Sequence, residues 1–310
     1  MRIRATVAAV TGALALSALA VPAAQAVDTT PGKADSFKAA QAAHQAASGK
    51  TAFTGEDAAD TGTPYALDAT FSGVKINNGK PIVVGTTGKV TVPVTFTVTH
   101  AADVDLNADD TELDVVIYRG SYDAPANFLL GDDWPACTSA SATVSNCKGT
   151  VDIYPTEELS NADATTFKAL GYIIDWNDVD PMADDVDWSK VGYTEGDALA
   201  TTRLQRLSKL TVNASPEPVT KGKTITVTGK LTRANWDTNT YTGYAGVYAQ
   251  LQFRKKGATT YTTVKSVKTT STGGLSTTVK ASADGYYRYS FVGTTTSPAV
   301  KAAGDFVDVR

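Results

Sequence analysis

The sequence predicts an all-β protein with two β-sandwich domains, preceded by a signal peptide and a flexible leader. Between Val90 and Thr99, valine and phenylalanine alternate with threonine and proline, which is the period-two pattern of a strand with one buried face. Thr, Val and Tyr are frequent in the second half of the chain, as is typical of strands. Seven short strand-like segments follow residue 206, and a chain of 310 residues is long enough for about two domains.

The first 26 residues have the pattern of a secretory signal peptide. Arg2 and Arg4 give a positive start, residues 5–20 are apolar and uncharged, and Ala24–Ala26 forms an A-x-A cleavage site. The apolar run covers about 16 residues, whereas a membrane-spanning helix needs about 20. We therefore expect cleavage before Val27, a secreted product and no transmembrane segment in the mature chain.

Residues 27–64 are predicted to be a disordered leader. Ala, Thr, Gly, Asp and Lys dominate this stretch, and large apolar residues are nearly absent. Ser36 could cap a short helix over Lys38–His44. Such a helix would lack an apolar face and would have little to pack against.

Residues 65–205 are predicted to form the first, acidic sandwich. Asn77–Gly79 is a turn sequence, and one helical turn is expected between residues 156 and 168. The strands expected in this domain are Val90–Thr99, Leu113–Tyr118, Val151–Tyr154 and Tyr172–Trp176.

Residues 206–310 are predicted to form a second sandwich with an immunoglobulin-like number of strands. Alternating apolar residues mark the buried faces of its segments. The seven expected strands are Leu210–Ala214, Lys223–Thr232, Gly246–Arg254, Thr260–Lys268, Gly274–Lys280, Tyr286–Val292 and Phe306–Arg310.

Two stretches of this second domain resemble bacterial secreted modules of the immunoglobulin-like or fibronectin-III-like type. Leu210–Pro216 followed by Val219–Gly229 is similar to the opening of such a module, and Ala283–Tyr289 resembles its late strand, where an Asp-Gly turn leads into a tyrosine-bearing strand. The resemblance covers about a third of the chain and implies a spacer or binding role. The inter-sheet cysteine pair of antibody domains is missing from this domain.

Charge is divided unevenly between the two halves. Residues 27–208 carry a net charge of −15 and residues 209–310 a net charge of +9, within an overall −4. We expect the basic domain to bind an anionic cell-envelope polymer or polysaccharide, or else to dock on the acidic domain. Nucleic acid is an improbable target for an exported chain with an acidic first half. The candidate cations are Lys221, Lys223, Lys230, Arg254, Lys255, Lys256, Lys265, Lys268 and Lys280.

The two cysteines, Cys137 and Cys147, are predicted to form a disulfide. The nine residues between them are small and polar, so they can fold back as a hairpin or surface loop. In an exported protein a disulfide is the default, and two free buried thiols are the alternative.

A twelve-residue acidic segment, residues 103–114, is a candidate calcium loop. Its oxygen-bearing side chains alternate, which lets a loop curl around one ion. It resembles an EF-hand loop in part, but Ala108 stands where a glycine allows the turn, and the flanks read as strands. The alternative is a solvated acidic loop. The candidate ligands are Asp103, Asp105, Asn107, Asp109, Thr111 and Asp114.

Aromatic residues in the loop between Arg233 and Gly246 are candidates for glycan contact. Trp236, Tyr241 and Tyr244 lie there among basic residues, and aromatic faces can stack on sugars. The sequence thus offers carbohydrate binding as an alternative function.

Enzymatic signals are weak. There are two histidines, His44 in the predicted leader and His100 at the end of a strand, and neither a G-x-S-x-G nor an H-E-x-x-H motif occurs. Paired carboxylates of the first domain could hydrolyse glycosides, but nothing singles out a pair. We therefore predict a non-catalytic extracellular binding or structural protein, with a secreted hydrolase as a further alternative and calcium as the one candidate cofactor.

Overall fold

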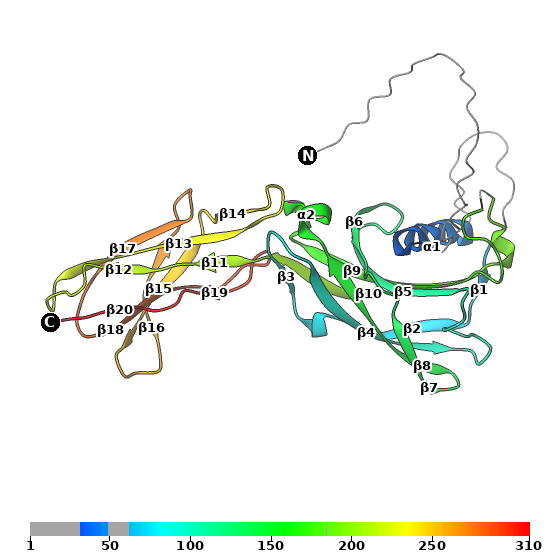
Figure 1. Cartoon of the computed structure of the whole chain (residues 1–310), viewed down its shortest axis with the longest axis horizontal. Coiled ribbons are helices and arrows are strands. Elements are labelled where there is room, and N and C mark those ends of the chain that lie inside the picture. Colours follow the sequence, from blue (N-terminus) through cyan, green and yellow to red (C-terminus); the bar gives the residue numbers. More distant parts are fainter. Residues whose placement is uncertain (1–31, 49–61, 184) are drawn as a thin grey trace, which may run out of the picture. The chain divides into compact units, whose positions relative to one another are not determined.

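The computed structural model describes residues 32–48, 62–183 and 185–310, and these form an all-β protein with one long helix (Figure 1). The predicted signal peptide, residues 1–26, lies outside the described residues. None of the helices in the described ranges is long and apolar enough to cross a membrane.

The first half of the described chain is a sandwich of two sheets. The larger sheet has the strand order β1-β10-β9-β5-β6, and β3 pairs with the end of β10. Its strands are β1 (Tyr65–Ala66), β3 (Ile82–Val84), β5 (Thr111–Gly120), β6 (Pro125–Leu129), β9 (Thr166–Asp175) and β10 (Gly192–Arg206). The smaller sheet has the order β2-β4-β8-β7 and contains β2 (Ala69–Ile76), β4 (Val90–His100), β7 (Ala136–Ser141) and β8 (Val144–Ile153).

The alternation seen in the sequence sets the buried face of β4. Val92, Val94, Phe96 and Val98 are buried in the core between the two sheets, while the threonines between them point to the other face. The predicted strand over Val90–Thr99 is therefore confirmed.

A 15-residue helix, α1 (Lys33–Ala47), packs against the outer face of the larger sheet, so the prediction of a disordered leader is wrong for these residues (Figure 1). Phe37, Ala40 and Ala43 are fully buried at a helical spacing. Alanines offer so little apolar surface that the sequence of this segment does not reveal an apolar helix face. They nevertheless let the helix approach the sheet closely, and Phe37 fills the space between them. The N-cap is Gly32 rather than Ser36, which lies inside the helix.

The second half is another sandwich of short strands with its own apolar core. One sheet contains β11 (Ser208–Leu210), β12 (Asn213–Ser215), β13 (Thr224–Asn235), β14 (Thr240–Gly243) and β17 (Gly274–Lys280). The other contains β15 (Tyr248–Lys255), β16 (Thr262–Lys268), β18 (Gly285–Phe291), β19 (Val300–Lys301) and β20 (Asp305–Val307). Every strand predicted in this half has a counterpart. The first is split into β11 and β12, and β14 forms where a loop was expected.

Short helical turns complete the chain. They are η1 (Asn77–Gly79), α2 (Pro155–Glu158), η2 (Asn161–Asp163) and η3 (Trp188–Lys190). The helical turn predicted between residues 156 and 168 has counterparts in α2 and η2.

The two sandwiches meet through the start of the second half. Leu207 N–H donates to the Val84 carbonyl (2.9 Å), and Ala234 N–H donates to the Leu207 carbonyl (2.8 Å). Ala234 and Trp236 are part of the core of the first sandwich. The predicted domain boundary between residues 205 and 206 coincides with the end of β10 and stays a prediction.

The predicted disulfide is confirmed. Cys137 in β7 and Cys147 in β8 lie directly opposite each other in the strand register, and their sulfur atoms are bonded. The bond therefore closes a hairpin at the edge of the smaller sheet.

Replacing both cysteines with serine should lower the free energy of unfolding by about 2–3 kcal/mol, because the bond restricts the unfolded chain over a short loop. Urea titration measures this change, and exposed Ser139 and Ser141 in the same hairpin, replaced by alanine, supply the control. Equal stability of the two double variants, or thiols that alkylate without prior reduction, would contradict it.

Candidate functional site

The acidic loop and the disulfide hairpin border a hollow of about 470 Å³. His100, at the end of β4, contributes its imidazole, and its Nε2 lies 3.2 Å from Ser145 Oγ. Asp105 Oδ1 accepts a hydrogen bond from Asn107 N–H (2.9 Å), which holds the loop in a turn. The wall is therefore mixed, because carboxylates and hydroxyl groups share it with apolar side chains such as Val104 and Leu106.

The structure separates the six predicted calcium ligands. Asp103, Asp105 and Asn107 line the hollow, Asp109 is exposed on the same loop, and Thr111 begins β5. Asp114 is buried inside β5 and paired elsewhere, so its assignment as a ligand is wrong. In the described ranges, no three His, Cys, Asp or Glu side chains are grouped to hold a metal ion. Calcium binding by the rest of the loop stays a prediction.

A buried ion pair holds the first turn of α1. Lys33 Nζ lies 2.9 Å from Asp114 Oδ2 and donates to the Asp133 carbonyl (2.8 Å), and both charged side chains are almost inaccessible to solvent. A cation at a helix N-terminus is unfavourable by itself, so Asp114 accounts for its position. Burial raises the pKa of the Asp114 carboxyl, and the Lys33 ammonium opposes that rise.

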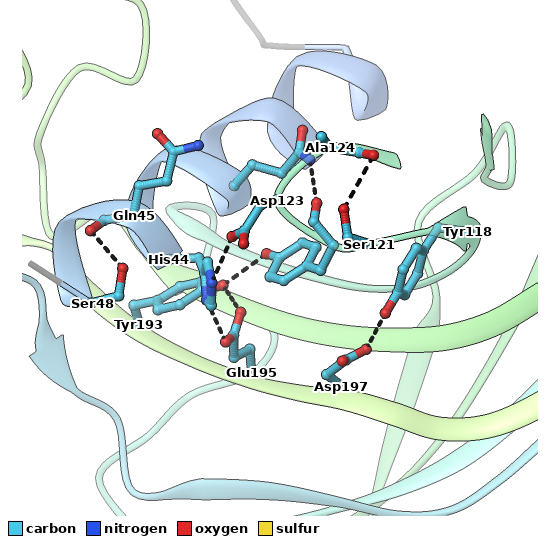
Figure 2. A network of polar contacts seen from close by, with 12 residues as sticks. His44, Gln45, Ser48, Tyr118, Ser121, Asp123, Ala124, Tyr193, Glu195 and Asp197 are labelled. Atoms are coloured by element: carbon cyan, nitrogen blue, oxygen red, sulfur yellow. Dashed lines mark hydrogen bonds and ion pairs between the residues drawn. The ribbon is translucent and has the colours of Figure 1, made fainter. Parts of the chain in front are cut away.

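The last turn of α1 is held by a second polar cluster, which Figure 2 shows from close by. His44 lies between two carboxylates, with Nδ1 2.7 Å from Glu195 Oε1 and Nε2 3.1 Å from Asp123 Oδ1. Tyr193 donates to Glu195 (2.5 Å) and contacts the hydroxyl of Tyr122 (3.1 Å). Burial raises the pKa of both phenols, so both stay protonated.

These two clusters attach the helix to the sheet at both ends. The apolar contacts of Phe37 lie between them, including a ring contact with Phe128 at 4.7 Å between centroids. The polar groups bond to one another across the interface, and this arrangement is structural rather than an opening for substrate. The sequence interpretation missed it because His44 and Lys33 were assigned to a disordered leader. The signal that could have revealed it is Phe37 with alanines at helical spacing.

The three aromatic residues predicted to contact glycan do not form an exposed platform. Trp236 is 2% exposed, and its indole N–H donates to the Gly85 carbonyl (2.8 Å). Tyr244 is buried in the second core with Arg233 over its ring at 3.9 Å, and Tyr241 is half-buried with Lys209 over its ring at 3.5 Å. Burial and these cations already cover the ring faces on which a sugar would have to stack.

The predicted basic side chains of the second sandwich lie at its surface. The eight lysines of the set are exposed, and Arg254 is half-buried against Tyr286 at 4.3 Å. Within the part of the chain that the structure describes, every ion pair joins residues of the same half. The positive charge of this half is therefore not neutralised by ion pairs with the described acidic half.

No family model matches the chain, and no curated protein matches it either. Solved structures with some likeness include the adhesin InvE of Yersinia pseudotuberculosis, at 11% identity over 77% of this chain and 58% of that chain, with a TM-score of 0.23. The D00-D0 domain of intimin is 15% identical over 77% of this chain and 99% of that one, with a TM-score of 0.24. Three domains of the bacteriophage RB49 outer capsid protein Hoc are 13% identical over 78% and 70%, with a TM-score of 0.27. At TM-scores this low, the likenesses carry no argument, and the fold rests on the strand pairing itself.

Proposed function

We propose that this chain is an exported, non-catalytic protein of the cell envelope whose C-terminal sandwich binds an anionic polymer. The observation that carries the proposal is the exposed positive charge of residues 209–310, which has no ion-pair partner in the described acidic half. Repeated anionic groups, such as phosphates on a wall polymer, complement such a surface through long-range attraction.

The alternative in which the basic domain docks on the acidic one receives no support from the ion pairs. Within the second half, Lys256 pairs with Asp284 (3.5 Å) and Arg310 with Asp308 (2.9 Å). Contacts between the sandwiches instead use a buried tryptophan and amide groups such as that of Asn161. Docking of the two halves and binding of a polymer by the lysines are therefore compatible.

Export is supported by the disulfide as well as by the predicted signal peptide. Disulfides persist in oxidising compartments and are rare in the cytosol. The bond between Cys137 and Cys147 closes a hairpin in an exposed part of the first sandwich. Stabilisation by calcium would be a further property of such an extracellular protein, and it rests on the acidic loop alone.

The mature protein should sediment with purified cell envelopes at low salt and be released as the salt concentration rises. The Debye length falls from about 10 Å at 0.1 M to about 3 Å at 1 M, which screens the attraction. Charge reversal at Lys221, Lys230 and Lys255 should weaken retention about tenfold or more. Reversal of the exposed lysines Lys75, Lys80 and Lys148, in the acidic half, is the matched control.

Two results would contradict the proposal. One is a mature protein that stays in solution at low salt. The other is retention that both sets of charge reversals weaken equally, since the effect would then follow total charge and not the C-terminal surface. Pure polyphosphate, used as a soluble probe in place of envelopes, separates binding to anionic groups from binding to other envelope material.

A further inference from the structure

The C-terminal sandwich is open along one side. There, among the strands that the structure describes, β16 and β17 are the edge strands of the two sheets, each paired with one neighbour, β15 and β13 respectively. The other side is closed, because Ala214 N–H donates to Asp305 (2.6 Å) and Val219 N–H donates to the Asp308 carbonyl (2.9 Å). The two sides of the sandwich therefore differ in how much backbone is left to pair.

The register of β17 shows which backbone groups face the open side. Ala281 N–H donates to the Lys223 carbonyl, and the Gly273 carbonyl accepts from Leu231 N–H, so the odd-numbered residues of this segment bond to β13. In an antiparallel ladder the backbone N–H and C=O groups of the alternate residues then point away from the partner strand. The outward-facing residues are Ser276, Thr278 and Lys280.

Lys265 confirms this direction. Its Nζ crosses from β16 and donates to the Thr278 carbonyl (2.8 Å). A lysine over an edge strand is a device that protects the strand from pairing with other chains. It also places a removable cation beside the outward backbone groups of β17, which pair with no other strand of the described residues.

A hollow of about 510 Å³, lined by both apolar and polar side chains, lies beside this edge. Phe253, Val279 and Tyr287 line it, and Val264, itself 45% exposed, lies at its border. Lys265 and Lys280 line the same hollow. Apolar side chains thus meet backbone groups and two cations in one place.

We propose that β17 pairs with an extended acidic peptide, which adds a strand to this edge. Outward backbone groups at a two-residue repeat fit an extended chain. The hollow accepts one large apolar side chain of that chain, and the lysines pair with carboxylates on either side of it. Lys265 then exchanges the Thr278 carbonyl for a carboxylate. An anionic polymer without backbone amides could use the lysines but not the strand edge, so this site is distinct from polymer binding.

The probe is a fluorescent decapeptide in which glutamate alternates with valine, with one central phenylalanine. The test uses the mature chain and its variant Thr278→Pro. Proline removes an outward N–H, and it leaves the bonds to β13 in place because those belong to the odd-numbered residues. Binding measured by fluorescence anisotropy should weaken at least tenfold in this variant, whereas Thr278→Val, which keeps the N–H, should bind like the native chain.

Hydrogen exchange on the native chain gives a second, independent readout. The peptide should slow exchange of the Ser276, Thr278 and Lys280 amides, and this result does not depend on how well any variant folds. Failure to bind at millimolar peptide, equal binding by the proline and valine variants, or protection at other amides would each overturn the proposal. Polyphosphate should bind both variants equally, so its loss would count against the proposed function and not against strand addition.

Discussion

Replacing Lys33 with methionine should lower the free energy of unfolding by about 3–5 kcal/mol at pH 7.5, because it leaves the buried carboxylate of Asp114 without its cation, with only the Val115 N–H still donating to it. The pair joins atoms 2.9 Å apart, and both side chains are almost fully buried. Urea titration of the mature chain gives the change directly. Lys38→Met on the same helix is the matched control, because Lys38 is exposed and forms only a surface pair with Asp35.

The loss of unfolding free energy caused by Lys33→Met should be smaller at pH 5 than at pH 7.5. Burial raises the pKa of Asp114 in the folded state, and the variant lacks the cation that opposes this rise. An acid whose pKa is raised on folding adds stability below its unfolded pKa, near 3.9 for Asp, and loses that contribution as the pH rises through the folded pKa. Acidification therefore protonates Asp114 and removes the buried charge.

A double variant, Lys33→Met with Asp114→Asn, separates this explanation from simple loss of packing. Without any buried charge, most of the lost stability should return. A double variant as unstable as Lys33→Met, or a pH-independent loss, would show that packing of the lysine stem and not charge holds the first turn of α1.

Replacing Trp236 with alanine should cost about 3–5 kcal/mol and loosen the contact between the two sandwiches. The indole is 2% exposed, lies in the core of the first sandwich and donates to the Gly85 carbonyl. Because Arg206 is buried near this contact, trypsin cleavage after Arg206 should become faster in the variant. Denaturant unfolding and timed proteolysis measure the two effects.

Trp134→Ala is the matched control, since that tryptophan is 39% exposed. It should change stability by less than about 1 kcal/mol. Trp236→Phe keeps most of the apolar contact and should cost about 1–2 kcal/mol, largely through the lost hydrogen bond. If Trp236→Ala behaves like Trp134→Ala, the indole does not hold the sandwiches together.

Local pattern was enough to predict most of the strands. The side chains of β4 alternate because successive residues of any strand face opposite sides, and this rule needs no knowledge of the partner strand. The hairpin disulfide was also predictable from local sequence, because a short polar turn joins Cys137 and Cys147. The charge contrast between the halves is likewise a property of the sequence alone.

The place of α1 was decided by tertiary structure. Phe37 and the alanines near it form an adequate apolar face only because the sheet opposite supplies aromatic rings such as that of Tyr172, which lies far along the chain. The same holds for Asp114, which reads as the last ligand of an acidic loop until Lys33 is brought next to it.

What the sequence by itself determined was the class of structure: strands, turns, a disulfide hairpin and two halves of opposite charge, all of which follow from neighbouring residues. What only the tertiary structure decided was the use of particular side chains. Trp236 is a core residue of the other sandwich and not an exposed sugar platform, and β17 keeps an open edge because β16 belongs to the opposite sheet. The reason is physical, since burial and pairing depend on contacts between residues distant in the chain, whose energies no local pattern contains.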